Sequence, residues 1–119
     1  MISEWSLETY MLKWYRNLYI GDSLKKHHFK MIADLNAGRK VFGRYLITFP
    51  VNEKNQLEIV NTANLVQKYV YRHTPMIIGI AGSHEEAVEI VLEITKECVR
   101  KTGDAEIRNF LEEKISNGM

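Results

Sequence analysis

The sequence predicts one small α+β domain, with a two-layer α/β arrangement in which about five helices cover a three-stranded mixed sheet. Two observations carry this prediction. Short runs of β-branched and aromatic residues at 45–49, 57–60 and 76–81 are bounded by Pro, Gly and Asn, which is typical of strands. The other segments repeat apolar residues at spacings of three and four, which is typical of helices. The predicted order is α-α-β-β-α-β-α-α, in a single domain over residues 1–119.

The first helix is predicted over residues 3–20 and ends at Gly21, because glycine readily adopts the left-handed conformation found at helix ends. Its apolar stripe, with spacings of four, three and four, consists of Leu7, Met11, Trp14 and Leu18. The alternative for residues 18–20 is a short strand, because Tyr and Ile favour strands. For these three residues the sequence leaves both alternatives open.

A second helix begins after Asp22 or Ser23, whose side chains can cap it, and ends at residues 36–38. Its apolar stripe consists of Leu24, His28, Met31 and Leu35. The two strands that follow, 45–49 and 57–60, are expected to form a hairpin across a polar connection.

A third helix is predicted from Asn61 or Thr62 to about residue 72, because Pro75 disfavours a helical conformation at the residue before it. Residues 76–81 form the most hydrophobic stretch of the chain and are short and β-branched, so we expect a buried central strand. The crossover that joins the hairpin to this strand is expected to be right-handed.

Two helices follow the central strand. Ser83 and Glu86 form a capping box at the start of a long helix that ends at Gly103. Two apolar stripes run along this helix, so we expect it to be well covered. The first stripe consists of Ala87, Val91, Ile94 and Cys98, and the second of Val88, Leu92 and Val99. Asp104 caps the final helix, and residues 116–119 are expected to fray.

The net charge of +1 conceals a polarised chain. Residues 1–50 carry a balance of +4, residues 51–75 of +1 and residues 76–119 of −4. This distribution fits ordinary solvated helix faces, and it also fits electrostatically matched self-association or an anionic partner for the basic half. A dedicated nucleic-acid binder is usually more basic than a pI of about 7.9. Contact with nucleic acid through the basic N-terminal half is therefore the weakest of these alternatives.

Composition also limits the compartment. A single cysteine, Cys98, excludes an internal disulfide framework. No apolar run approaches the roughly 18 residues that span a bilayer, and the first residues lack the basic and apolar regions of a signal peptide. We therefore expect a cytoplasmic protein with no membrane attachment.

Segment 79–84, Gly-Ile-Ala-Gly-Ser-His, leads from the central strand into the long helix. Free backbone N–H groups at a helix start can bind an anion, so we consider a site for a nucleotide or phosphorylated metabolite here. Its candidate residues are Gly79, Gly82, Ser83 and His84. The segment matches neither the dinucleotide fingerprint nor the P-loop, and Glu85 and Glu86 would repel a phosphate. An ordinary capped turn between strand and helix is the alternative.

Aromatic side chains gather near the N-terminus. Such a segment can dock onto its own domain, or onto a partner, because Trp and Tyr are favoured at the centres of interfaces. If the protein associates, the predicted surface consists of Trp5, Tyr10, Trp14 and Tyr15. Edge residues of the hairpin are the second choice.

No pattern of catalytic or metal-ligating residues emerges. The four histidines lack metal-ligand spacing, and no serine or cysteine has a sequence signature of activation. We therefore predict no catalytic residue, metal or cofactor. The leading hypothesis is a non-enzymatic protein that acts by association, as a homodimer or with another protein. The alternative is a binder of a small anionic ligand at residues 79–84.

Overall fold

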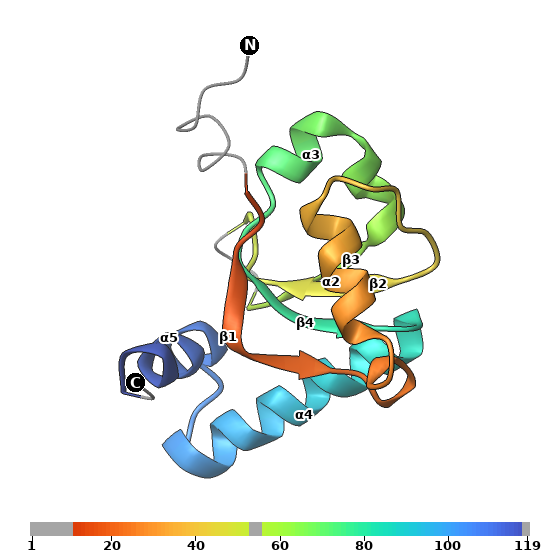
Figure 1. Cartoon of the computed structure of the whole chain (residues 1–119). Coiled ribbons are helices and arrows are strands. Elements are labelled where there is room, and N and C mark those ends of the chain that lie inside the picture. The colour runs from red at the N-terminus through yellow and green to blue at the C-terminus, as the bar shows by residue number, and fades with distance from the viewer. Residues whose placement is uncertain (1–10, 53–55, 118–119) are drawn as a thin grey trace.

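The computed structural model describes residues 11–52 and 56–117 (Figure 1). In this part of the chain, four strands form one mixed sheet in the order β1-β4-β2-β3. The strands are β1 (Trp14–Ile20), β2 (Tyr45–Thr48), β3 (Glu58–Asn61) and β4 (Ile77–Ala81). The α-helices are α2 (His28–Asn36), α3 (Lys68–Arg72), α4 (His84–Thr102) and α5 (Ile107–Asn117). Two 3-10 helices, η1 (Asp22–Leu24) and η2 (Thr62–Val66), complete the description.

The main difference from the sequence-based prediction is β1. Residues 14–20 form an edge strand parallel to β4, where a helix over 3–20 was expected, so the strand alternative for residues 18–20 is confirmed. Tyr15 and Tyr19 pack on one face of the sheet, and Trp14 and Leu18 on the other. Aromatic and β-branched residues suit such a two-sided strand. The predicted three strands and five helices are therefore wrong, since the described residues form four strands and four α-helices.

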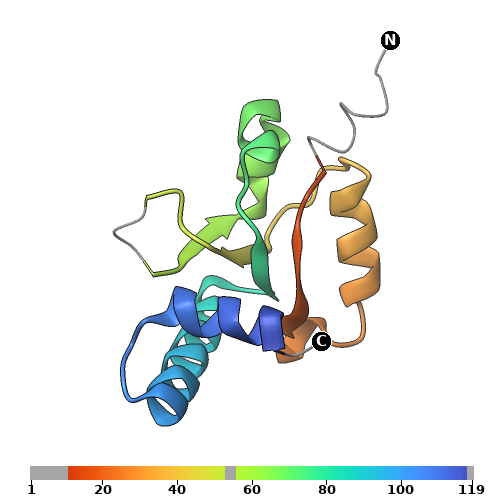
Figure 2. The ribbon, with the colours of Figure 1, turned by 90° about the vertical axis from the view of Figure 1, so that its left-hand side faces the viewer.

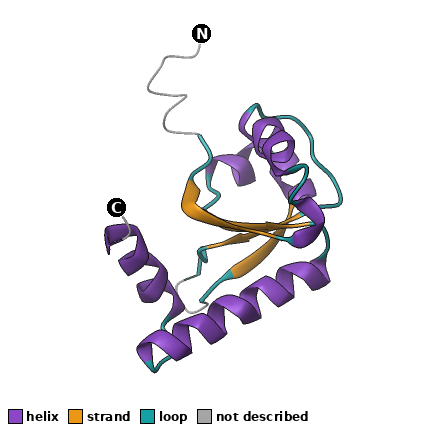
Figure 3. Ribbon diagram, turned by 60° about the horizontal axis from the view of Figure 1, so that its bottom comes forward, coloured by secondary structure: helices purple, strands orange, loops and turns teal. Residues whose placement is uncertain are grey.

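Helices cover both faces of the sheet, which gives three layers where two were expected (Figures 2 and 3). One face packs against α2, η2 and α3, and the other against α4 and α5. The alternation of side chains along a strand produces this division. Ile78 faces α4 and α5, whereas its neighbour Ile77 faces the α2 side.

The hairpin and the central strand are confirmed. β2 pairs antiparallel with β3, from Tyr45 opposite Asn61 to Thr48 opposite Glu58. β4 lies between β1 and β2, and all five of its residues are buried. β3 and β4 run in the same direction with β2 between them, so η2 and α3 form a crossover connection.

The caps of α4 also agree with the sequence. The Ser83 hydroxyl accepts a hydrogen bond from the Glu86 N–H at 3.1 Å. Gly103 ends the helix with a φ of 82°, a left-handed conformation that favours glycine. α5 continues to Asn117, so it includes the first two residues of the segment expected to fray, and residues 118–119 lie outside the described residues.

Candidate functional site

The turn between β4 and α4 lies against the loop that follows β1. The Gly21 N–H donates to the Ile80 carbonyl oxygen at 2.9 Å and continues the pairing of β1 with β4 beyond the strand. This contact places Ser23 beside the start of α4. Two segments about 60 residues apart in the sequence therefore meet at the predicted anion site.

A carboxylate of the chain itself occupies this place. The Glu86 side chain accepts a hydrogen bond from the Gly82 N–H at 2.8 Å. It also accepts one from the Ser23 hydroxyl at 2.7 Å and one from the Ser23 N–H at 3.2 Å. We call this carboxylate, with its three hydrogen bonds to Gly82 and Ser23, the Glu86 anchor. Among these donors, the Gly82 N–H belongs to the predicted anion site, and the Glu86 carboxylate takes it.

Two glycines leave room for the Glu86 anchor. A Cβ at Gly21 would overlap the Glu86 carboxylate, and a Cβ at Gly82 would overlap the Ser23 hydroxyl. The backbone of Gly21, with φ −59° and ψ 145°, suits any residue, so glycine is required there only for side-chain space. Burial alone would raise the pKa of Glu86, but the hydrogen bonds from Gly82 and Ser23 hold it below its ordinary value.

The other predicted residues of the turn have packing or capping contacts. Gly79 lies in β4, where a Cβ would come within 3.0 Å of the Tyr19 carbonyl oxygen. Ser83 caps α4, and the exposed His84 ring meets the Tyr45 ring edge-on, with centroids 5.6 Å apart. Of the predicted residues, Gly82 donates its N–H to the Glu86 carboxylate, whereas Ser83 accepts from the Glu86 backbone N–H, and the anion site stays a prediction.

Two of the four aromatic residues predicted at an interface pack inside the domain. Tyr15 is 2% exposed, and its hydroxyl donates to the Leu111 carbonyl oxygen at 3.3 Å. Trp14 is half-buried, and its Nε1–H donates to the Asn36 side-chain oxygen at 2.8 Å. These bonds tie β1 to α5 on one face and to α2 on the other. Trp5 and Tyr10 lie outside the described residues.

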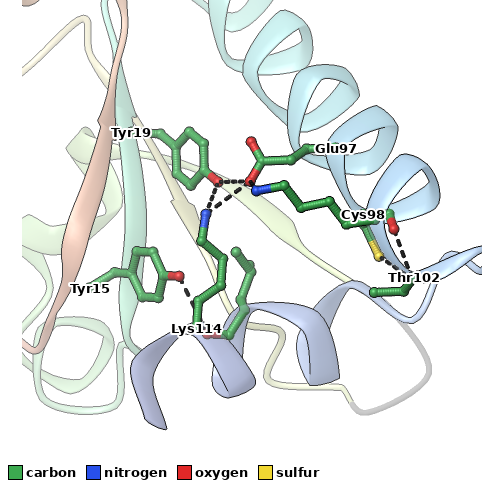
Figure 4. A network of polar contacts seen from close by, with 8 residues as sticks. Tyr15, Tyr19, Glu97, Cys98, Thr102 and Lys114 are labelled. Carbon is green, nitrogen blue, oxygen red and sulfur yellow. Dashed lines mark hydrogen bonds and ion pairs between the residues drawn. The ribbon is translucent and has the colours of Figure 1, made fainter. Parts of the chain in front are cut away.

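A polar cluster between β1, α4 and α5 has no counterpart among the sequence-based predictions (Figure 4). Lys114 Nζ donates to Glu97 Oε1 at 2.9 Å, and the Tyr19 hydroxyl reaches the same oxygen at 3.5 Å. The hydrogen bond from Lys114 lowers the pKa of Glu97. Burial alone would lower the pKa of Lys114, but the bond to Glu97 holds it above its ordinary value. Glu97 and Lys114 therefore stabilise each other's charged forms and join α4 to α5, and the Tyr19 hydroxyl adds β1 to the cluster.

The outward face of α4 carries an apolar row, which we call the α4 stripe: Val88, Leu92 and Val99. These side chains are 37%, 52% and 46% exposed, so the expectation that both stripes of this helix are covered is wrong for the described part of the chain. A shallow hollow of about 400 Å³ adjoins the stripe. It is lined by Glu89, Leu92, Glu93, Lys96, Glu97 and Arg100.

Several basic residues of the N-terminal half are engaged in ion pairs. Lys25 lies 2.9 Å from Asp22, and both Lys30 and Arg39 contact Asp34, at 2.8 and 3.0 Å. These carboxylates reduce the positive potential that a nucleic acid would meet around α2.

Other chemistry finds little support in the described ranges, 11–52 and 56–117. They contain no group of three or more His, Cys, Asp or Glu residues placed to hold a metal ion. Cys98 is buried, and its thiol donates to the Asp104 carbonyl oxygen at 3.3 Å. Among the described helices, none combines the length and apolar character needed to cross a membrane.

Comparisons with known proteins add no functional information. The chain matches no protein-family model, no curated protein and no solved structure.

Proposed function

We propose that this is a non-enzymatic cytoplasmic protein that acts by association with a second copy of itself through the α4 stripe. The observation that carries the proposal is that α4 has two apolar faces, and the sheet covers only one of them. The covered face consists of Ala87, Ile90, Ile94 and Cys98. The α4 stripe lies on the other side of the helix and is between 37% and 52% exposed.

The arrangement of the stripe favours a helical partner. Single exposed apolar side chains are normal on protein surfaces. Leu92 lies four residues from Val88 and seven from Val99, so the three side chains form one continuous row over about three turns. Burying a Leu side chain completely contributes about 1.5–3 kcal/mol, so the exposed half of Leu92 contributes about 1 kcal/mol from each copy.

The test is the Leu92→Glu substitution, with Leu92→Met as the matched control. Leu92 is half exposed, so a charge there leaves the folded monomer intact while it opposes burial against a second copy. We expect light scattering to give a dimer for the wild type and for Leu92→Met, and a monomer for Leu92→Glu at the same concentration.

Thermal unfolding of the same samples separates association from internal packing. A Leu92→Glu variant that keeps the dimer mass would contradict the proposal. If the wild type and Leu92→Glu are both monomers and the variant is less stable, another segment of the same chain covers the stripe. This outcome also contradicts the proposal.

A further inference from the structure

The charges along α4 make the helix complementary to itself when two copies run in opposite directions. Its N-terminal half is acidic, with Glu85, Glu86, Glu89 and Glu93. Its C-terminal half carries Lys96, Arg100 and Lys101, together with Glu97, which is paired with Lys114 of α5. The helix dipole favours this order of signs within one helix, but it does not determine on which side of the helix the charges lie. Glu89 and Lys96, two turns apart, flank the α4 stripe on the same side.

The spacing of the stripe fits an antiparallel helix pair. Val88, Leu92, Thr95 and Val99 recur at four, three and four residues, the spacing of alternating core positions in a coiled coil. Thr95 is the one polar residue in this row, and its hydroxyl donates to the Val91 carbonyl oxygen at 2.8 Å within the helix. The polar atom of Thr95 is therefore satisfied, and its methyl group is free to pack.

We propose that the α4 helices of two copies pack antiparallel about a two-fold axis between Leu92 and Thr95, an inference that rests on the proposed function. Leu92 then lies opposite the partner's Thr95, and Val88 lies opposite the partner's Val99. In this register Glu89 lies beside the partner's Lys96, and the symmetry of the pair repeats the contact. A parallel pair would place one acidic half beside the other, which disfavours that orientation. The partner is thus a second copy, and these two charged residues select its orientation.

A charge exchange tests the register. Glu89→Lys leaves only lysines at the two flanking positions, and Lys96→Glu leaves only glutamates, so each variant repels itself. We expect each to raise the dimer dissociation constant about 10- to 30-fold at low salt, because two attractive contacts become repulsive. An equimolar mixture of the two variants, and the double variant with both exchanges, restore tight pairing.

The measurement is sedimentation equilibrium of the full chain at low and at high salt. The expected result is recovery of the dimer in the mixture, with the difference reduced at high salt by screening. Glu106→Lys and Lys40→Glu change the net charge by the same amounts at exposed residues outside α4 and serve as controls.

The possible outcomes separate the two proposals. A dimer that both single variants leave unchanged, or that the mixture fails to restore, overturns the antiparallel register and leaves self-association standing. A wild type that stays monomeric contradicts self-association itself.

Discussion

The Gly21→Ala substitution is expected to break the Glu86 anchor, although the backbone at Gly21 suits alanine. The added Cβ would overlap the Glu86 carboxylate and displace it from its donors. The three hydrogen bonds to Gly82 and Ser23 are then lost together. The donors left behind are partly accessible to water, which replaces some of the lost energy.

The cost follows from these three bonds. A net contribution of about 0.5–1 kcal/mol for each accessible or partly accessible bond gives a loss of about 2 kcal/mol. An unfolding entropy of about 2.1 cal/mol/K per residue converts this loss into a fall in Tm of about 8 °C for a chain of 119 residues.

In a Glu86→Ala background, Gly21→Ala is expected to stabilise the protein instead of destabilising it. Without the carboxylate, the new Cβ meets none of the Glu86 atoms that obstruct it. Alanine then restricts the unfolded chain more than glycine does. We expect Gly21→Ala to stabilise the Glu86→Ala variant by about 0.4–1 kcal/mol. The coupling between the two sites is therefore about 2–3 kcal/mol.

Denaturant unfolding of the wild type, both single variants and the double variant measures this coupling. Glu85→Ala is the matched control, because it removes a carboxylate from the same first turn of α4 without touching the anchor. Equal costs of Gly21→Ala in both backgrounds would refute the reasoning, as would a wild type that tolerates the alanine.

Two further predictions concern β1, and a third concerns pH. Trp14→Phe removes the bond to Asn36, and we expect calorimetry to show a loss of about 1 kcal/mol with no change in dimer mass. Tyr15→Phe removes the buried bond to Leu111 and is expected to cost about 1 kcal/mol by the same measurement. The folded pKa of Glu97 lies below its unfolded value of about 4.3, so its contribution is present above that pH and is lost as the pH falls through the folded pKa. Glu97→Gln should therefore flatten the acid limb of a stability profile measured from about pH 2 to 6, and an unchanged profile would contradict this.

The sequence predicts those elements whose signals are local. β4 follows from a short apolar run between Pro75 and Gly82, and the start of α4 follows from the capping box at Ser83. For β1 the sequence offered a strand only at residues 18–20, because its aromatic residues fit a helical stripe as well as an alternating strand. Its pairing with β4 also joins segments about 60 residues apart. The periodicity of apolar residues does not indicate that β1 pairs with β4.

The Glu86 anchor is likewise predicted only as far as its local signal extends. The capping box identifies Glu86, and in that motif its side chain returns to the N–H of the capping residue. Here the carboxylate reaches the Gly82 N–H and Ser23, which lies 63 residues earlier, and this second contact has no signal in the sequence. For the α4 stripe, periodicity indicates that Leu92 belongs to an apolar row, but it does not indicate what covers that row.

The most direct test of self-association is the molar mass of the wild-type chain measured by light scattering as the concentration increases. The proposed function predicts a rise from the 13.9 kDa of one chain to twice that value. The mass should then reach a plateau, because a two-fold pair leaves no open interface for a third copy. A mass that stays at 13.9 kDa over the whole concentration range would contradict self-association through the α4 stripe.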